Sequence, residues 1–497
     1  MKLRIGRRVS IFSLVLSLIL WFSSANQVLA KNQLPSPPQR HVLERLTFGV
    51  TSSEIEQLNQ KGLETYIQSQ LNPQQVAESS SLTSYLAKLD LINQKPIALQ
   101  KKDSAYRQKR RNSQLSDRQN REIGRQIFKL NNRAVNQSLN AHLARAIYSN
   151  RQLQEVMVDF WFNHFNVYLR KGAIKLWIND YEEKIRTHAL GNFRDLLEVT
   201  AKHPAMLIYL DNRKNTSPDS LVGQRRKLGL NENYARELME LHTLGIDGGY
   251  TQDDVIALAR ILTGWGVDHT GTKGDKKGFF FHKNRHDQED KLFLGQKITA
   301  NGILEGEKAL DILASHPATA RFISYKLVQY FVADQPPASL VERLTQEFID
   351  SQGNIKTLMN VLIHSQEFND PQYYKQKFKT PYQYVISLVR MGEIKQPSFL
   401  RIRGMLEQLS MPLFQCLVPT GYKNTQAAWL NPQAMLQRTS LATAIANNKL
   451  NRDYRLKPQQ LKRNLGNLSH NTKQVIAKSP PKLRSALIMG SPEAMYR

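Results

Sequence analysis

Residues 156–168 would form a helix that is apolar on nearly every side. At 100° per residue, its polar side chains gather in one stripe of Asp159, Asn163 and Asn166. A helix of this kind is expected to lie inside a large protein body, covered on all sides. Because a buried polar group without a partner costs ~1–3 kcal/mol, other parts of the chain must face the stripe.

Residues 231–245 contain a second polar stripe on a predicted helix. The side chains on or beside its polar face are Asn233, Arg236, Glu237 and Glu240. His242 points roughly away from Glu237 and Glu240 on an ideal helix, which disfavours a metal site built from this helix alone. Any set of metal ligands would have to combine several helices.

Further polar candidates lie between the two stripes. Arg186 can pair with Glu182 four residues earlier. Asp211 stands where a helix would stop, and His203 precedes a proline in a position that suits a helix cap. The histidines that could instead bind a metal are His164, His203 and His242. Taken singly, such histidines are more often part of the core than metal ligands.

Two interpretations fit the stripes. In the first, they line one pocket in the region 153–265, where Glu237 and Glu240 act as acid/base carboxylates. The residues expected to bind substrate there are Asp159, Asn163, Asn166, Arg186, Asn233, Arg236 and Asp211. In the second, the same side chains form closed networks that fix how the helices pack. His282, His286 and Asp287 could complete the pocket, although an exposed loop is the simpler interpretation.

Helical signals dominate the rest of the chain. Thr51 and Glu54, for example, have capping-box spacing. Alternation is clear only near residues 278–298, where 279–281 and 291–298 could pair as a small β-ribbon. The predicted fold is therefore mostly α, a large multi-helix body with that small β excursion.

The chain divides into five predicted parts. They are a signal peptide (1–30), an N-terminal helical part (31–94), a basic insertion that is either a long exposed helix or partly disordered (95–135), the main helical body with the polar pocket (136–447), and a basic C-terminal segment (448–497). The first part has a basic start, an apolar run and small residues before Ala30, as secretory signals do. Cleavage near Ala30 predicts export to the periplasm or out of the cell; a retained anchor is the alternative.

Positive charge is concentrated in two stretches. The formal net charge is +27, or +23 without the four basic residues of the signal. Residues 95–129 hold eleven Lys and Arg against three acidic residues (+8), and residues 449–484 hold ten against one (+9). Neither stretch has the interleaved aromatic residues of a single-strand binder or a DNA-reading motif, so nucleic acid is disfavoured as a partner. An anionic envelope polymer or lipid fits better.

Several marked classes of site are excluded. Cys416 is the only cysteine, so intrachain disulfides and cysteine-based zinc or iron–sulfur sites cannot form. Any metal would need His, Asp, Glu or Asn ligands, and the cofactor is left unknown. The chain lacks a Gly-x-Ser-x-Gly elbow, a His-Glu-x-x-His motif, a phosphate loop and a dinucleotide glycine pattern. Hydrolases that need only two placed carboxylates remain open.

Six segments of the chain resemble one bacterial family. They are 41–49 (HVLERLTFG), 160–166 (FWFNHFN), 203–207 (HPAML), 231–245 (NENYARELMELHTLG), 247–251 (DGGYT) and 491–497 (SPEAMYR). On these motifs the chain is similar to the domain-of-unknown-function family numbered 1800, with Ala494 where a phenylalanine is expected. The resemblance implies an exported bacterial protein, often encoded beside a secreted protein of the alkaline-phosphatase or sulfatase type. It supplies no established catalytic residues.

Three functions remain open from the sequence. The first is an envelope hydrolase that acts on polysaccharide or another anionic polymer through buried carboxylates. The second is a non-catalytic scaffold or partner of a secreted phosphatase/sulfatase-like protein, with the basic segments docking an acidic surface. The third is a metalloprotein with histidine and carboxylate ligands.

Overall fold

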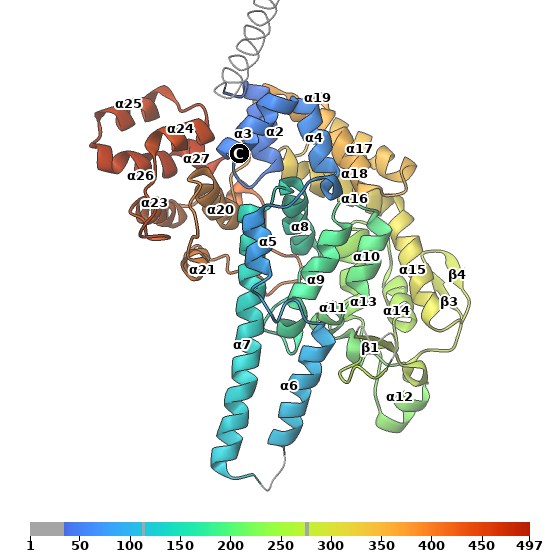
Figure 1. The fold of residues 1–497 in the computed structure, drawn as a ribbon. Coiled ribbons are helices and arrows are strands. Elements are labelled where there is room, and N and C mark those ends of the chain that lie inside the picture. Colours follow the sequence, from blue (N-terminus) through green and yellow to red (C-terminus); the bar gives the residue numbers. More distant parts are fainter. Residues whose placement is uncertain (1–33, 112–114, 274–277) are drawn as a thin grey trace, which may run out of the picture.

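Figure 1 shows the computed structural model of the chain, which describes residues 34–111, 115–273 and 278–497. The predicted signal peptide at 1–30 lies outside the described residues. The described chain is mostly helical with two small antiparallel sheets, which confirms the predicted fold class. Within this part of the chain, no helix is both long enough and apolar enough to cross a membrane.

The N-terminal part consists of short helices. They are α2 (Pro37–Leu46), α3 (Ser52–Lys61), α4 (Leu63–Leu71), η1 (Pro73–Gln75) and α5 (Ser80–Leu86). The capping box at the start of α3 is confirmed, since the Thr51 side chain accepts from the Glu54 amide and the Glu54 carboxylate accepts from the Thr51 amide at 2.7 Å. Gly62, at φ 80°, separates α3 from α4 without breaking the packing of either helix.

A helical hairpin, which we call the arm, projects from the body (Figure 1). It consists of α6 (Pro96–Arg110) and the first half of α7 (Asp117–Tyr148). With 32 residues, α7 is ~48 Å long, and its second half enters the core. Asp103 ties the two helices together by accepting from the Asn131 amide at 2.9 Å. The described residues of 95–135 thus form two helices packed as a hairpin, with a turn at Arg111.

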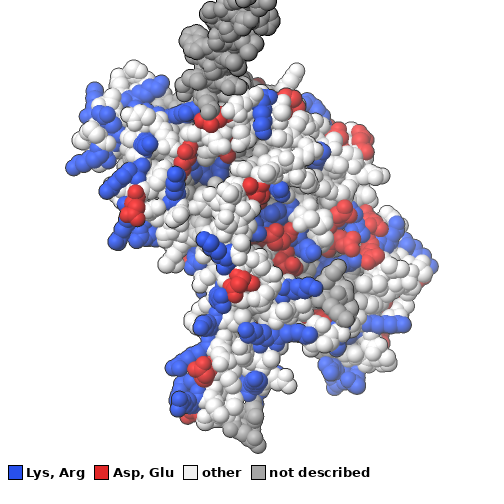
Figure 2. Space-filling model, in the orientation of Figure 1, with Lys and Arg blue, Asp and Glu red and all other residues white. Residues whose placement is uncertain are grey.

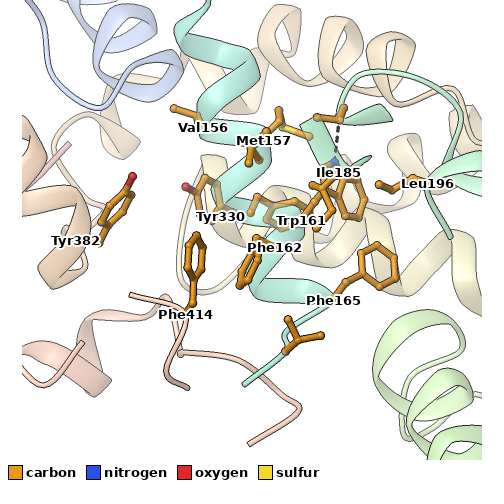
Figure 3. Close-up of a cluster of buried hydrophobic side chains, with 14 of the residues drawn as sticks. Val156, Met157, Trp161, Phe162, Phe165, Ile185, Leu196, Tyr330, Tyr382 and Phe414 are labelled. Carbon is orange, nitrogen blue, oxygen red and sulfur yellow. Dashed lines mark hydrogen bonds between the residues drawn. The ribbon is translucent and has the colours of Figure 1, made fainter. Parts of the chain in front are cut away.

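Helix α8 (Gln152–His164) lies in the core, and Figure 3 shows the large side chains around it. Trp161 is fully buried, and its Nε1 donates to the Ala189 carbonyl at 3.0 Å. The rings of Phe162 and Phe414 lie 4.5 Å apart, centroid to centroid. Segments far apart in the sequence thus meet on this helix, as its all-round apolar pattern predicts.

The chain continues from α8 through short helices to the sheets. They are α9 (Ile174–His188), α10 (Phe193–Ala201), α11 (Pro204–Tyr209), η2 (Asn212–Lys214), α12 (Leu221–Arg226), α13 (Asn233–Glu237), η3 (Leu238–Thr243) and α14 (Gln252–Ile261). The strands β1 (Trp265–Val267) and β2 (Phe279–Phe281) pair, as do β3 (Lys291–Phe293) and β4 (Gln296–Ile298), with η4 (Lys283–Arg285) between the pairs.

The predicted pairing of 279–281 with 291–298 is wrong. Residues 291–298 pair with themselves because Leu294 and Gly295, at φ 48° and 73°, close a tight hairpin turn. The strand at 279–281 pairs instead with 265–267.

The segment between the two ribbons is an exposed loop at Lys283, Asn284 and 288–290 and half-buried at His282, but it buries two of the three candidate residues. His286 and Asp287 are 1% and 4% exposed. His286 Nε2 lies 2.8 Å from Glu305, and Asp287 pairs with Arg260 at 2.9 Å. Lys291 bridges Glu305 and Asp287, so this is a buried ionic network in which every charged member has a partner.

The remaining helices complete the body and end beside its N-terminal helices (Figure 1). They are α15 (Ile303–Ser315), α16 (Pro317–Phe331), α17 (Ala338–Asp350), α18 (Ile355–His364), α19 (Gln366–Asn369), η5 (Pro371–Tyr373), α20 (Pro381–Met391), α21 (Phe399–Gln408), α22 (Gln426–Trp429), α23 (Pro432–Ala446), α24 (Pro458–Leu465), α25 (His470–Lys478), η6 (Pro481–Leu483), α26 (Arg484–Met489) and α27 (Pro492–Met495). One hydrophobic cluster extends from Val42 to Met495, so the predicted terminal parts share the core of the main body.

Two helical glycines offer a matched test of this packing. A Cβ at Gly306 in α15 would lie 2.2 Å from a ring carbon of Trp265, whereas one at Gly404 in α21 would meet no atom within 4 Å. We expect Gly306→Ala to lower the free energy of unfolding by ~1–3 kcal/mol or more through overpacking. We expect Gly404→Ala to raise it by ~0.5–1 kcal/mol because alanine favours the helix. Denaturant unfolding measures both, and equal effects would contradict the contact between α15 and Trp265.

Candidate functional site

Residues 231–245 do not form one regular α-helix. After α13 the chain forms the π-helix η3, and the Leu244 amide donates to the Met239 carbonyl five residues earlier at 2.7 Å. The wider turn leaves Glu240 half-buried at the surface while His242 is 1% exposed. Because π-turns inside helices occur frequently at functional sites, this segment is a natural place to look for one.

A pocket of about 540 Å³ lies between α8, η3 and α16, and we call it the α8–α16 pocket. The residues that line it are His164, Glu240, Leu241, Leu244, Gly245, Ile246, Asp247, Ala318, Arg321, Phe322, Tyr325, Lys326, Gln329 and Thr420. Two members of the predicted stripes and metal set, His164 and Glu240, therefore face the same cavity. Much of the remaining wall comes from α16, outside the region 153–265 in which a pocket was expected.

Lys326 and His164 form a hydrogen-bonded pair in this pocket. The Lys326 ammonium donates to His164 Nδ1 at 2.8 Å, and His164 Nε2 donates to the His242 carbonyl at 3.0 Å. These contacts assign His164 as a neutral imidazole with its proton on Nε2. Burial and the Lys326 charge together hold the pKa of His164 well below its usual range. The histidine therefore orients the lysine and adds no charge of its own.

Lys326 has no side-chain carboxylate within ion-pair distance among the described residues. Its ammonium lies 5.2 Å from the centre of the Phe322 ring, a weak cation–π contact. Burial lowers the pKa of Lys326 to about 8. The pocket thus holds a cation that an anionic group from outside could pair with.

The carboxylate side chains that line the pocket belong to Glu240 and Asp247, whereas Glu237 lies near Glu240 but outside the lining. Tyr250 lies close enough to Glu240 to feel its charge. Glu237 is half-buried, and burial followed by the nearby charge of Glu240 raises its pKa. Two neighbouring carboxylates with different environments suit one proton donor and one proton acceptor.

The polar stripe of α8 faces protein rather than the pocket. Asn163 donates to the Tyr422 carbonyl at 2.8 Å and accepts from the Tyr422 amide at 2.7 Å. Asn166 donates to the Cys416 and Val418 carbonyls at 3.1 and 2.8 Å. Asp159 accepts from the Tyr330 hydroxyl at 2.9 Å. These side chains hold the 416–422 loop and α16 against α8.

Arg186 belongs to a separate buried ionic network. It is 8% exposed and pairs with Glu155 at 2.8 Å and Glu183 at 2.7 Å, and it also contacts Glu182. His142 Nδ1 lies 3.1 Å from Glu182 on the other side. With three carboxylates around it, Arg186 has no capacity left for substrate in this conformation.

The other predicted binding residues have partners near the surface. Asn233 donates to the Leu210 carbonyl at 3.1 Å, and Arg236 pairs with Glu232 at 3.2 Å. Asp211 adopts φ 61° and pairs with Lys171 at 2.8 Å. None of these three residues lines the α8–α16 pocket.

His203 lies in a second, larger groove of about 990 Å³, between the base of the arm, α9, α10 and β2. Its Nδ1 accepts from the Ala205 amide at 3.1 Å, which caps α11, and its Nε2 lies 3.0 Å from Asp180.

The Nε2 atom of His242 is buried without a partner among the described residues. The rings of His242 and His164 lie 6.1 Å apart, centroid to centroid. The described residues contain no group of three or more His, Cys, Asp or Glu side chains placed to hold a metal.

Sequence reasoning missed Lys326, the residue that gives the pocket its charge. The available signal was its position between Ile323 and Leu327, in a helix whose neighbouring side chains are largely buried. Lys326 is half-buried, and a lysine at this position is as informative as the asparagines of α8, because removing an unpaired charge from water is costly.

The pH dependence of stability tests the environment of Lys326. Its pKa is about 8 in the folded protein and near 10.5 in the unfolded chain, so between these values the unfolded chain binds more protons. We therefore expect the stability of the wild type relative to Lys326→Met to rise across pH 8–10.5. Urea unfolding of both proteins measures this difference in stability. The contributions of other buried lysines are the same in both proteins and therefore cancel. Parallel pH profiles would show that Lys326 is not desolvated.

Comparison with known proteins agrees with the motif resemblance. A family model described as "Protein of unknown function (DUF1800)" matches residues 41–496. No match was found among curated proteins, and none among solved structures. The chain therefore belongs to the DUF1800 family.

Proposed function

We propose that the protein is exported and that its α8–α16 pocket binds and hydrolyses an anionic polymer of the bacterial envelope, such as an acidic polysaccharide. The observation that carries this proposal is the Lys326 ammonium, which has no carboxylate partner in the described part of the chain and shares a pocket of about 540 Å³ with Glu240. A pocket of this size accommodates a ligand of a few sugar units or less.

In the proposed reaction, Lys326 would bind the substrate and the two glutamates would transfer protons. Lys326 would pair with an acidic group of the substrate, assisted by Arg321 at the exposed rim. Glu240 would accept a proton from the attacking water, and Glu237, which has a raised pKa and lies near Glu240 outside the pocket lining, would donate a proton to the leaving oxygen of a substrate that extends beyond the pocket. The glycosidic carbon–oxygen bond breaks as the new bond to the water oxygen forms.

Carboxamide variants test these roles. We expect Glu237→Gln and Glu240→Gln each to reduce hydrolysis ~10²-fold or more, because each removes a proton-transfer group. The assay is release of reducing ends from uronic-acid polysaccharides and of phosphate-linked units from teichoic acid. Glu232→Gln is the matched control, since Glu232 lies on the same segment and its carboxylate is already paired with Arg236.

Two results would count against the hydrolase. One is an absence of release from every polymer by the folded wild type, and the other is full activity in both carboxamide variants. Lys326→Met should raise KM more than it lowers kcat, because its proposed role is to bind an acidic group of the substrate.

A second candidate function is docking to an acidic partner, and the arm is the observation that favours it. Figure 2 shows Lys and Arg side chains along the arm. The exposed cations on its two helices and the adjoining turn are Lys101, Lys102, Arg107, Lys109, Arg110, Arg111, Arg118, Arg121, Arg125 and Lys129. A secreted phosphatase/sulfatase-like protein, or an anionic lipid or polymer, would offer the complementary charge.

Charge reversal on the arm tests docking. We expect Arg118→Glu combined with Arg121→Glu and Arg125→Glu to abolish a salt-sensitive interaction in a pull-down from envelope extract, without lowering the melting temperature. Reversal of Lys473, Lys478 and Lys482 near α25 is the comparison, since these cations belong to the other basic stretch. Recovery of the same partners by the arm variant would rule out the arm as the docking element.

A further inference from the structure

A second group of cations without side-chain ion pairs lies where residue 497 meets α2, and we call it the buried cation cluster. Its members are Arg45, Lys379, Arg438 and Arg497, which are 0%, 9%, 0% and 3% exposed. None of them has a side-chain carboxylate within ion-pair distance among the described residues. The two acidic residues nearby are already engaged, Glu44 by Lys375 and Asp334 by Lys377.

The cluster satisfies few of its hydrogen-bond donors. Arg45 and Arg497 each donate only through Nη2, to backbone carbonyls, and their Nε and Nη1 atoms are buried without a partner. Arg438 is in the same position, and its guanidinium lies 4.3 and 4.9 Å from the centres of the Phe378 and Tyr384 rings. The Arg497 guanidinium likewise lies 4.6 Å from the centre of the Tyr330 ring. Lys379 donates to the Ala494 carbonyl and the Ser387 hydroxyl, which leaves one N–H of its ammonium.

Two members of the cluster line a small cavity beside α20. Its volume is about 20 Å³, which is room for one particle of about the size of a water molecule. Its polar lining includes Glu44, Thr47, Lys375, Lys379, Gln383 and Arg497. Three cations therefore face this space against one carboxylate, which is already paired with Lys375.

Such an arrangement is costly without a counter-charge. Removing an ammonium or guanidinium from water disfavours its charged form unless an anion or a set of acceptors replaces the solvent. Burial and then the charge of Lys375 lower the pKa of Lys379 to about 7, and burial followed by the charge of Arg497 lowers that of Arg45. A single negative charge in the cavity would offset the repulsion among these groups.

We propose that the cavity beside α20 binds one monatomic anion, chloride under ordinary conditions, held by the Lys379 ammonium and the Arg497 guanidinium. The ion joins the segment before α20 to residue 497 and stabilises their contact with α2. This site is separate from the α8–α16 pocket and does not depend on the function proposed for it.

Thermal unfolding of the full mature protein tests the site. The protein is prepared free of halide and titrated with sodium chloride or sodium gluconate at constant ionic strength. We expect a saturable upward shift of the melting temperature with chloride and none with gluconate, which is too large for the cavity. Equal shifts in the two salts would overturn the proposal.

Variants and bromide locate the ion. Lys379→Met should abolish the chloride-dependent shift, and Arg497→Gln serves if the first variant does not fold. Lys326→Met and Lys478→Met should retain the shift, because neither residue lines the cavity. Crystals grown in sodium bromide should give an anomalous peak beside Lys379 and Arg497. A cavity that holds only water, with no anomalous signal, would overturn the assignment.

Discussion

The burial of α8 on every side determines much of how the body is assembled. Its apolar surface needs partners from all directions, and its few polar groups need specific ones. Trp161 reaches a carbonyl after α9, Asp159 reaches Tyr330 on α16, and Asn163 pairs with the backbone of Tyr422. The contacts of Asp159 and Asn163 place α16 and the 416–422 loop, which supply Lys326 and Thr420 to the α8–α16 pocket. The pocket therefore depends on α8 even though only His164 of that helix faces it.

Local sequence patterns account for the helices and for the existence of polar stripes, but not for the partners of those stripes. The capping box at Thr51 and the glycine after α3 act within a few residues, so the sequence reveals them directly. Asn163 finds its partner 259 residues later, and no local signal points to Tyr422. The pairing of β3 with β4 follows from the turn at Leu294 and Gly295, a leucine–glycine pair that composition alone does not mark as a hairpin turn.

The π-helix explains why the sequence predicted the arrangement of the second polar stripe, on residues 231–245, only in part. An α-helix and a π-helix have the same sequence signals, and the balance between them is set by tertiary contacts. In η3 the wider turn leaves the His242 carbonyl free to accept from His164 while Glu240 remains in the pocket. An ideal α-helix correctly predicts that the side chains of His242 and Glu240 point in different directions. It cannot show that the backbone carbonyl of His242 accepts a hydrogen bond from His164.

Buried charge distinguishes the structural regions of this protein from the candidate sites better than polarity does. Arg186 is surrounded by Glu155, Glu182 and Glu183, so its desolvation is offset within the protein and no ligand is required. Lys326 and the buried cation cluster are the opposite case, since none of them has a side-chain carboxylate within ion-pair distance among the described residues, and the charges of Glu44 and Asp334 offset only part of the desolvation of Lys379 and Arg45. A stripe of asparagines can be satisfied by backbone groups, whereas an unpaired ammonium needs an anion, neutralisation or solvent. The volumes then separate the two sites: about 540 Å³ around Lys326 suits a molecule that enters and leaves, and about 20 Å³ beside Lys379 suits an ion that stays.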